Sequence, residues 1–495
     1  MNNNQIGRLI LSSKNTYKFN NKPAKLCIIL SDNNTDVLIN TNKEFNTQDN
    51  YVLVDIINKK IIDNYGYVGI DTDDLNIYHH LHTYFWSSNT KLYKYMRDFD
   101  FSYDIEKLRE SYDDIVITID PLDSTDLDDG FTLNFNGDIV NLDIHIADPT
   151  SYFDFEKEYT WKLIEELSSR ISTCYIPIDG KIKHLLPEIN INGNNLLELS
   201  TLIGKNKRAI SFCFDINIVT GQVNMKIKKT ILNNILNNTY ENYDKKINED
   251  IIYKNKLINL CDFMIKKIIC NVKITDSDKI NFSHKLIEIF MIWTNYYAGE
   301  YLSENKNKMF VRTQEKYLDI NTKIPEYAKS FLNVGAKYNY VDFKNDNIYY
   351  HYSLGIKNYC HVTSPMRRFI DMVNHLLLHN LDNKEEIYYK FIKIFNTDEI
   401  NNTLSKYKKL ANGYEILKHL KINNTFKCCI FDKLDNNKVL IVIYDEIYNF
   451  KKIIKTVLPT DFEKINKYDE ITIQIYYDSF KFKSKSLPFY IKILE

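Results

Sequence analysis

Short apolar runs separated by polar turns mark both ends of the chain. Four β-rich runs occupy the first 71 residues, at 8–11, 25–30, 36–39 and 51–57. The same pattern returns after residue 423, with runs at 426–431, 438–444, 470–477 and 489–494. Regular spacing of short strands is typical of small barrels. We therefore predict an OB-like β-barrel over residues 1–72 and a second one over residues 422–495.

The middle of the chain mixes strands with helical periodicity. Helical patterns lie at Phe153–Ile171, Lys254–Ile269, Ser283–Ser303 and Ser364–His379. Residues 73–112 are aromatic and charged without clear periodicity, so we expect a connecting segment with some helix. The predicted fold class is α+β: a mixed core of sheet and helices over residues 113–421, flanked by the two barrels.

An acidic loop is the strongest chemical signal. The apolar run at 115–119 leads into five aspartates within ten residues, and an Asn-Gly turn at 136–137 predicts a hairpin directly after them. Carboxylates crowded this closely repel one another unless cations neutralise them. Oxygen ligands suit Mg²⁺ or Mn²⁺, which can clamp the oxygens of a phosphodiester. A solvated acidic loop is the alternative.

A calcium loop of the EF-hand kind is a further alternative for this segment, and the spacing excludes it. Such a loop needs Gly at position 6 and Glu at position 12. With Asp126 as position 1, Gly130 falls at position 5 and Gly137 at position 12, and no Glu is present.

The net charge conceals a segregation. Lys and Arg total 64 and Asp and Glu total 65, so the charge of −1 argues against a nucleic-acid binder. Residues 111–150, however, hold ten Asp and no Lys, Arg or Glu, which leaves +9 on the other 455 residues. An ion-neutralised loop would therefore sit in a mildly basic protein.

Several classes are excluded or disfavoured by composition. No apolar run approaches the ~18 residues that span a bilayer, and the N-terminus lacks the apolar region of a signal peptide. The eight cysteines form no CxxC pair, which favours reduced core thiols over zinc or disulfides. We expect a soluble cytoplasmic protein that is a monomer and has no membrane contact.

Three motifs around the acidic loop resemble a known family. They are Thr-Ile-Asp-Pro at 118–121, Asp-x-Asp-Asp at 126–129 and Ile-His-Ile-Ala-Asp-Pro at 144–149. Together they resemble the signature of the ribonuclease II (RNB) family of processive 3′-to-5′ exoribonucleases, which implies an RNB-type catalytic core. The resemblance implies that the metal ligands are Asp120, Asp126, Asp128 and Asp129. Among these four, it implies that Asp128 takes part most directly in the chemical step.

Two downstream segments match the same family in order. Tyr175 lies in Arg-Ile-Ser-Thr-Cys-Tyr-Ile-Pro at 170–177, and the resemblance implies that it stacks on a base near the RNA 3′ end. Glu288 lies on a predicted helix that Ser283 could cap, and the resemblance implies a ribose contact. The plain alternatives are an ordinary aromatic residue at Tyr175 and an amphipathic helix with a buried Asn295.

The third downstream segment carries paired arginines. Ser364 followed by Pro365 predicts an N-cap and a first helical residue, which places Arg367 and Arg368 in the first turn. Paired Arg at a helix start suggests an anion partner. The alternative is a pair of salt bridges to Asp371 or to the acidic loop. The resemblance implies that Arg367 stabilises charge on the scissile phosphate and that Arg368 contacts RNA.

Some features depart from the family pattern or stay structural. Only one leading barrel is predicted, where the family has two. No base-stacking aromatic residue can be assigned near 271–283, and near 411–415 only a shifted Glu415 could serve as a later acid. His361 is interpreted as structural. His375 and His379 have helical metal-ligand spacing but lack the Glu of a zinc-protease motif.

The leading hypothesis is a metal-dependent exoribonuclease that hydrolyses single-stranded RNA from the 3′ end and releases nucleoside 5′-monophosphates. Its cofactor would be Mg²⁺, with Mn²⁺ as an alternative. A second hypothesis is a catalytically impaired RNA-binding scaffold of the same fold. A third is a metal-dependent DNase or phosphodiesterase on another fold, although such exonucleases scatter their acids across distant motifs.

Overall fold

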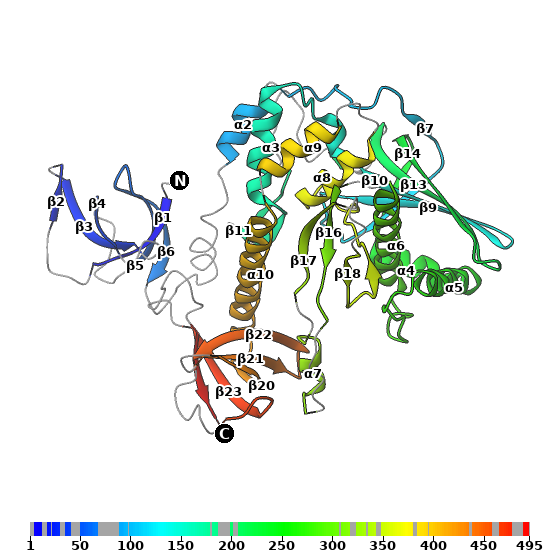
Figure 1. Ribbon diagram of the computed structural model, residues 1–495. Coiled ribbons are helices and arrows are strands. Elements are labelled where there is room, and N and C mark those ends of the chain that lie inside the picture. The colour runs from blue at the N-terminus through cyan, green and yellow to red at the C-terminus, as the bar shows by residue number, and fades with distance from the viewer. Residues whose placement is uncertain are drawn as a thin grey trace.

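The computed structural model describes most of the chain. The described residues are 4–11, 17–20, 22–29, 35–40, 50–67, 89–97, 99–178, 181–186, 199–200, 206–305, 308–316, 323–332, 335–342, 348–379, 384–394, 396–434, 438–457, 465–477 and 489–494. The part of the connecting segment before residue 89 lies outside this set. Figure 1 shows the arrangement of the elements.

The N-terminal sheet has the strand order of an OB-fold. Its strands are β1 (Asn4–Leu9), β2 (Tyr17–Phe19), β3 (Lys22–Ile29), β4 (Thr35–Asn40), β5 (Asn50–Asp55) and β6 (Lys60–Tyr67). β1 pairs with both β3 and β5, and β4 pairs with β6 in parallel, so five strands close into a ring around a small apolar core. β2 adds a hairpin to β3. This ring is the barrel that the alternating pattern predicts.

A seven-stranded sheet forms the centre of the mixed core. In sheet order its strands are β15 (Ile235–Thr239), β8 (Val116–Asp120), β9 (Asp129–Asn136), β10 (Ile139–Ala147), β13 (Lys207–Asn217), β14 (Val223–Leu232) and β7 (Glu110–Tyr112). The predicted Asn-Gly hairpin joins β9 to β10, and Gly137 has the positive φ of 62° that this turn needs. The acidic loop therefore lies between two neighbouring strands, β8 and β9.

Helices make up the rest of the core and lead from it to the C-terminal sheet. They are α2 (Asn89–Met96), α3 (Glu158–Arg170), α4 (Tyr240–Glu249), α5 (Ile251–Lys267), α6 (Phe282–Glu304), α8 (Phe369–Leu378), α9 (Lys384–Ile394) and α10 (Thr397–Leu420), with a 3-10 turn at Pro149–Tyr152. Apolar contacts such as Phe131 with Phe290 and Phe214 with Trp293 hold α6 on β9 and β13. The long helices at 254–269 and 283–303 agree closely with the periodicity.

Short strand pairs complete the core. They are β11 (Cys174–Ile178) with β12 (Lys181–Lys183), β16 (Lys308–Thr313) with β17 (Lys337–Asp342), and β18 (Tyr350–His351) with β19 (Ile356–Lys357). Asn374 on α8 accepts a hydrogen bond from the Phe310 N–H at 3.1 Å and donates to its carbonyl at 3.1 Å, which fixes β16 beside α8.

The C-terminal sheet repeats the OB strand order. It runs β22 (Phe450–Val457), β21 (Lys438–Asp445), β20 (Thr425–Lys433), β23 (Glu470–Tyr477) and β24 (Phe489–Ile493). Ile416 and Leu417 of α10 enter its apolar core, and Figure 1 shows α10 leading into this sheet. The short helix α7 (Glu326–Lys329) packs on its other face, where Tyr327 stacks on Tyr444. Glu415 forms an ion pair with Lys452 of this sheet.

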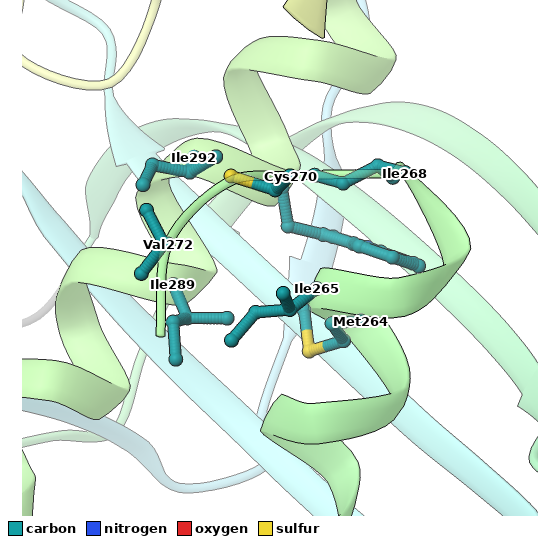
Figure 2. A pocket seen from close by; sticks show the side chains of 8 residues that line it. Met264, Ile265, Ile268, Cys270, Val272, Ile289 and Ile292 are labelled. Atoms are coloured by element: carbon teal, nitrogen blue, oxygen red, sulfur yellow. The ribbon is translucent and has the colours of Figure 1, made fainter. Parts of the chain in front are cut away.

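A small apolar pocket lies between α5 and α6. Figure 2 shows the side chains gathered around it, and all of them are apolar or weakly polar: Met264, Ile265, Ile268, Cys270, Val272, Ile289, Ile292 and Trp293. It holds no carboxylate and carries none of the predicted chemistry. All eight cysteines are free thiols. Among the described residues, no helix is long and apolar enough to cross a membrane.

Candidate active site

The acidic loop is placed by the pairing of β8 with β9. Ile117 pairs with Phe131, and the antiparallel direction brings Asp120 at the end of β8 to the level of Asp128, which directly precedes β9. The strands approach closely at Gly130, where a Cβ would lie 2.7 Å from Val116 Cγ1 and 3.1 Å from the Ile117 carbonyl oxygen. A glycine is therefore needed there to bring the carboxylates together.

Asp126 is held by two side chains from the β11–β12 segment. Its Oδ2 accepts a hydrogen bond from the Tyr175 hydroxyl at 3.2 Å and lies 3.3 Å from His184 Nδ1. The other His184 nitrogen, Nε2, lies 3.4 Å from Thr125 Oγ1. Tyr175 is half exposed, so its ring remains accessible beside the acidic loop. The predicted RNA-contact residue and the predicted metal ligand are thus in contact.

Asp128 joins the acidic loop to the arginine segment, 239 positions later. Its Oδ1 accepts a hydrogen bond from the Met366 N–H at 2.7 Å, and its Oδ2 accepts one from Arg367 Nε at 3.0 Å. The Asp128 side chain is 4% exposed, whereas that of Arg367 is 41% exposed. A second guanidinium nitrogen of Arg367 donates to Ser364 Oγ at 2.8 Å. These hydrogen bonds therefore fix the orientation of the Arg367 side chain and leave part of its guanidinium group exposed to solvent.

The prediction that a helix starts at Ser364 is wrong. Residues 365–367 form a turn, Arg368 is extended, and α8 begins at Phe369. The cause is a distant segment: the Thr173 N–H donates to the Arg367 carbonyl at 2.9 Å, and the Phe369 N–H donates to the Ile171 carbonyl at 2.8 Å. These bonds occupy backbone groups that an earlier helix would need, so the arginines precede the helix.

Arg368 is paired with an acid of its own helix. One of its guanidinium nitrogens donates to Asp371 Oδ2 at 2.8 Å, and the same oxygen accepts the Ser364 N–H at 2.8 Å. Both salt bridges considered for the arginine pair are thus observed, Arg367 with the acidic loop and Arg368 with Asp371. The salt bridges and the phosphate-binding interpretation are compatible, because neither arginine uses all five of its N–H donors.

Burial makes the remaining two carboxylates costly to ionise. Burial first, and then the charges of Asp128 and Asp126, raise the pKa of Asp120 to about 7. Burial, followed by the charge of Asp120, likewise raises the pKa of Asp129 to about 7. The Oδ2 atom of Asp120 is buried without a hydrogen-bond partner. For Asp128, burial outweighs Arg367 and raises the pKa well above its usual range.

These carboxylates have the chemistry that a hard divalent cation requires. The buried Oδ2 of Asp120 has no hydrogen-bond partner and lies beside other carboxylates that repel it, so a bound cation would stabilise it as a metal ligand. Within the described part of the chain, no three His, Cys, Asp or Glu side chains are gathered as a preformed metal-binding group. Asp126 and Asp128 are instead turned toward the protein donors described above.

Glu288 lies one helical turn from a stacked aromatic pair. Its carboxylate binds Lys285 Nζ at 2.7 Å, and it lies on the exposed face of α6. His284, four residues earlier, stacks on Tyr240 with ring centroids 3.6 Å apart. Tyr240 begins α4, which contacts β8, the strand that ends at Asp120, so this pair lies near the acidic loop. Burial, and then the charges of Asp129 and Asp120, raise the pKa of Tyr240 to about 12.

The helix that carries Glu288 differs from the prediction at its start. α6 begins at Phe282, and Ser283 is inside it rather than at its cap. Asp244 of α4 accepts hydrogen bonds from the Ser283 N–H at 2.8 Å and from its hydroxyl at 2.7 Å. An acid from another helix therefore supplies the capping oxygen that the sequence pattern assigned to Ser283.

Asn295 has a role that its sequence pattern only hinted at. Its side chain is buried, accepts the Val362 N–H at 2.8 Å, and donates to Tyr359 Oη at 3.1 Å and Thr363 Oγ1 at 3.2 Å. It thereby ties α6 to the segment at 359–363 that leads to the arginine turn. His361 in this segment is partly buried, and its Nδ1 shares a hydrogen bond with the Tyr338 hydroxyl at 2.6 Å, in agreement with a structural role.

The histidine pair at helical spacing serves the fold. His375 Nε2 lies 2.5 Å from the Val362 carbonyl oxygen. His379 lies between Glu106 at 2.8 Å and Asp148 at 3.1 Å, and Arg109 binds the other oxygen of Asp148 at 2.9 Å. The last Asp of the third family-like motif is therefore the centre of a buried ion network. Sequence reasoning missed this network and His184, because their partners lie far away in the chain.

Comparison with known proteins decides the family. The RNB domain model matches residues 106–261 and 254–384, which together make up more than half of the chain. The chain belongs to the RNB family. The predicted resemblance and the predicted fold class are confirmed, because the RNB match coincides with the core built around the acidic loop.

Relatives and solved structures agree with this assignment. The chain is 27% identical over 365 residues to "Exoribonuclease II, mitochondrial" of Saccharomyces cerevisiae, covering 60% of this chain and 36% of that protein. It is 23% identical over 373 residues to Ribonuclease R of Chlamydia pneumoniae, covering 63% and 52%. The RNB chain thus spans about half or less of these relatives. Mycoplasma genitalium RNase R in complex with ribose methylated single-stranded RNA shares the fold, with a TM-score of 0.67, 16% identity, and coverage of 99% and 89%.

Proposed function

We propose that this chain is a metal-dependent exoribonuclease that hydrolyses single-stranded RNA processively from the 3′ end and releases nucleoside 5′-monophosphates. One observation carries the proposal: Asp128 holds Arg367 at 3.0 Å beside the carboxylates of the acidic loop, although 239 positions separate them. Acids that can bind cations next to a half-exposed guanidinium are what a phosphodiester hydrolase requires. The relatives named exoribonuclease II and ribonuclease R support the same reading.

The cofactor in this proposal is Mg²⁺, with Mn²⁺ as an alternative. Asp120, Asp126 and Asp129 would hold it, with Asp128 completing the acidic set. When bound, the ion supplies Lewis-acid activation of the phosphate and of the attacking water. The buried, unpartnered Oδ2 of Asp120 and the raised pKa values of Asp120 and Asp129, about 7 each, support a site that needs added positive charge.

The side chains of the chain itself divide the remaining work. Arg367, oriented by Asp128, stabilises the charge that develops on the scissile phosphate. Asp128 is the carboxylate of the acidic loop that lies against the arginine turn, where it would also order the attacking water molecule. Tyr175 presents a half-exposed ring on which a base can stack without regard to its identity. Glu288 and Arg368 are the further RNA contacts of this proposal.

A catalytically impaired RNA-binding scaffold is the alternative on the same fold. All four aspartates and Arg367 are retained, and carboxylates that repel phosphate serve no purpose in a scaffold. RNA binding without metal-dependent cleavage would favour it. A monomeric state and a cytoplasmic location remain predictions.

The proposal is tested with the full chain and single-stranded RNA labelled at either end. Wild-type protein with Mg²⁺ should release labelled mononucleotides at once from 3′-labelled RNA, and 5′-labelled RNA should shorten without mid-length intermediates. Asp128→Asn and Asp120→Asn should each lose at least about 100-fold in rate. Asp123→Asn, an exposed Asp of the same loop, is the matched control.

Three results would overturn the proposal. The first is an inactive wild type in both Mg²⁺ and Mn²⁺. The second is full activity in Asp128→Asn. The third is equal cleavage of DNA and RNA of one sequence, which would favour a general phosphodiesterase.

A further inference from the structure

Arg312 is a partly buried cation without an acidic partner. It lies on β16, where its N–H donates to the Tyr359 carbonyl at 2.7 Å and its register partner on β17 is Tyr338. Its guanidinium carbon lies 4.5 Å from the centre of the Tyr338 ring. Among the described residues, no carboxylate lies within ion-pair distance of it. The stacking fixes the plane of the guanidinium and leaves its N–H donors unused.

Three other arginines of the core differ in this respect. Each has a carboxylate within 3.0 Å: Arg109 with Asp148, Arg367 with Asp128, and Arg368 with Asp371. An unpaired charge in a partly buried position is unfavourable. Arg312 therefore carries a cost that ion pairs remove at these three arginines.

Aromatic rings connect Arg312 to the arginine turn. The Tyr338 hydroxyl lies 2.6 Å from His361 Nδ1, and the His361 ring centre lies 5.2 Å from that of Tyr359. Figure 1 shows β16 and β17 close to α8, the helix that the turn precedes. Arg368 donates to Thr363 Oγ1 at 3.5 Å, and Asn295 donates both to that oxygen at 3.2 Å and to the Tyr359 hydroxyl at 3.1 Å, which links Arg368 to the same aromatic group.

The pair formed by Arg312 and Arg368 has an unmatched positive charge and an unused donor. Asp371 forms an ion pair with Arg368, whereas no carboxylate of the described residues forms one with Arg312. The Nε of Arg368 is buried without a hydrogen-bond partner. Burial, and then the charges of Arg368 and Arg312, lower the pKa of His361 well below its usual range, so its neutral ring adds no charge beside these arginines. One anion beside Arg312 would balance this pair of arginines.

We propose that Arg312, together with Arg368, binds one backbone phosphate of the RNA, separate from the phosphate that Arg367 faces. The inference rests on the proposed function, because an RNA strand supplies a row of phosphates at fixed spacing. A planar guanidinium matches phosphate oxygens in pairs, and stacking on Tyr338 orients it in advance. Arg312 would therefore position the strand and take no part in bond breaking.

The test measures RNA binding without hydrolysis. A 5′-labelled oligouridylate is titrated with the full chain in EDTA at several salt concentrations, for wild type, Arg312→Gln, Arg312→Lys and Arg97→Gln. Arg97 is an exposed arginine just after α2 and controls for the loss of one charge. We expect Arg312→Gln to weaken binding about tenfold and to reduce the salt slope by about one. Arg312→Lys should keep the slope, and Arg97→Gln should match wild type.

Several outcomes would overturn the inference. Unchanged affinity and salt slope in Arg312→Gln, with a lowered melting temperature, would assign Arg312 to packing alone. Uridine 5′-monophosphate supplies a phosphate without a strand, so an effect of Arg312→Gln on its binding alone would assign the site to the released nucleotide. If the wild type binds and hydrolyses RNA and Arg312→Gln binds RNA equally well, the role of Arg312 is refuted and the proposed function stands. If the wild type does not bind RNA, both the role of Arg312 and the proposed function are refuted.

Discussion

Replacing Asp120 by Asn should stabilise the metal-free protein at pH 8. Burial, followed by the charges of Asp128 and Asp126, raises the pKa of Asp120 to about 7. Its Oδ2 is buried without a partner, so no hydrogen bond from the described residues is lost with the charge. Asn has nearly the same shape and carries no charge, so the substitution removes the cost of burying a carboxylate.

The expected gain is about 2 kcal/mol in the free energy of unfolding. A rise in pKa from 3.8 to about 7 corresponds to at most ~4 kcal/mol, since each pKa unit is worth about 1.36 kcal/mol. The Asn amide must itself be buried, which takes back about 1–3 kcal/mol. Asp129, whose pKa also rises to about 7, titrates together with Asp120, so the two effects do not add.

The sign of the pH dependence follows from the same shift. A carboxyl group with a raised pKa in the folded state binds more protons there than in the unfolded chain. Its contribution is fully favourable below a pH of about 4 and is lost as the pH rises through about 7. Metal-free wild type should therefore lose stability between these pH values, and the Asp120→Asn variant should lose less.

Urea denaturation in EDTA at pH 5 and pH 8 measures this difference. Asp123→Asn, an exposed residue of the same loop, controls for the change in net charge. Added Mg²⁺ should stabilise wild type more than Asp120→Asn, because the variant lacks a ligand. Lower stability of Asp120→Asn than of wild type at pH 8 would refute the reasoning, and so would a pH dependence that the substitution leaves unchanged.

Three further predictions concern other parts of the site. Burial lowers the pKa of His379, but the charge of Asp148 outweighs burial, so the pKa is raised. The contribution of His379 to the free energy of unfolding is therefore full below pH ~6.5 and is lost as the pH rises through the raised pKa. Urea denaturation should show that His379→Gln costs about 3 kcal/mol at pH 6 and less at pH 9. Asn295→Leu leaves the buried Val362 N–H without its acceptor and should lower the free energy of unfolding by about 1–3 kcal/mol. A melting temperature equal to that of wild type would show that this hydrogen bond does not stabilise the fold. Tyr175→Phe should keep RNA affinity in EDTA, and Tyr175→Ala should lose about 1–3 kcal/mol of binding; equal affinities would rule out stacking.

Local patterns predicted the elements whose signals are local. The hairpin after the acidic loop follows from the Asn-Gly pair at 136–137, because Gly137 readily adopts the positive φ of 62° found in this turn. The C-terminal strands follow from alternating apolar residues, and α5 and α6 from long apolar periodicity. These signals depend on neighbours within about seven residues, so the sequence contains them in full.

The start of α8 could not be predicted in this way. Ser364 and Pro365 form a good helix start by local rules, yet residues 171 and 173 bind the backbone of residues 367 and 369 and delay the helix. The same limit applies to His184, whose partner Asp126 lies 58 positions earlier. Family resemblance indicated that the acidic loop and Arg367 belong to one site, but only the fold supplies their contact.

That contact changes how substitutions in the site must be interpreted. Both oxygens of Asp128 accept hydrogen bonds from the arginine turn, one from the Met366 N–H and one from Arg367. Asp128→Asn therefore disturbs the turn and the acidic loop at once, and its loss of activity cannot separate a metal ligand from a support for Arg367. Asp120 holds no backbone group and its Oδ2 is unpartnered. Because Asp120→Asn should stabilise the fold while it removes activity, the two measurements on this one residue separate metal binding from folding.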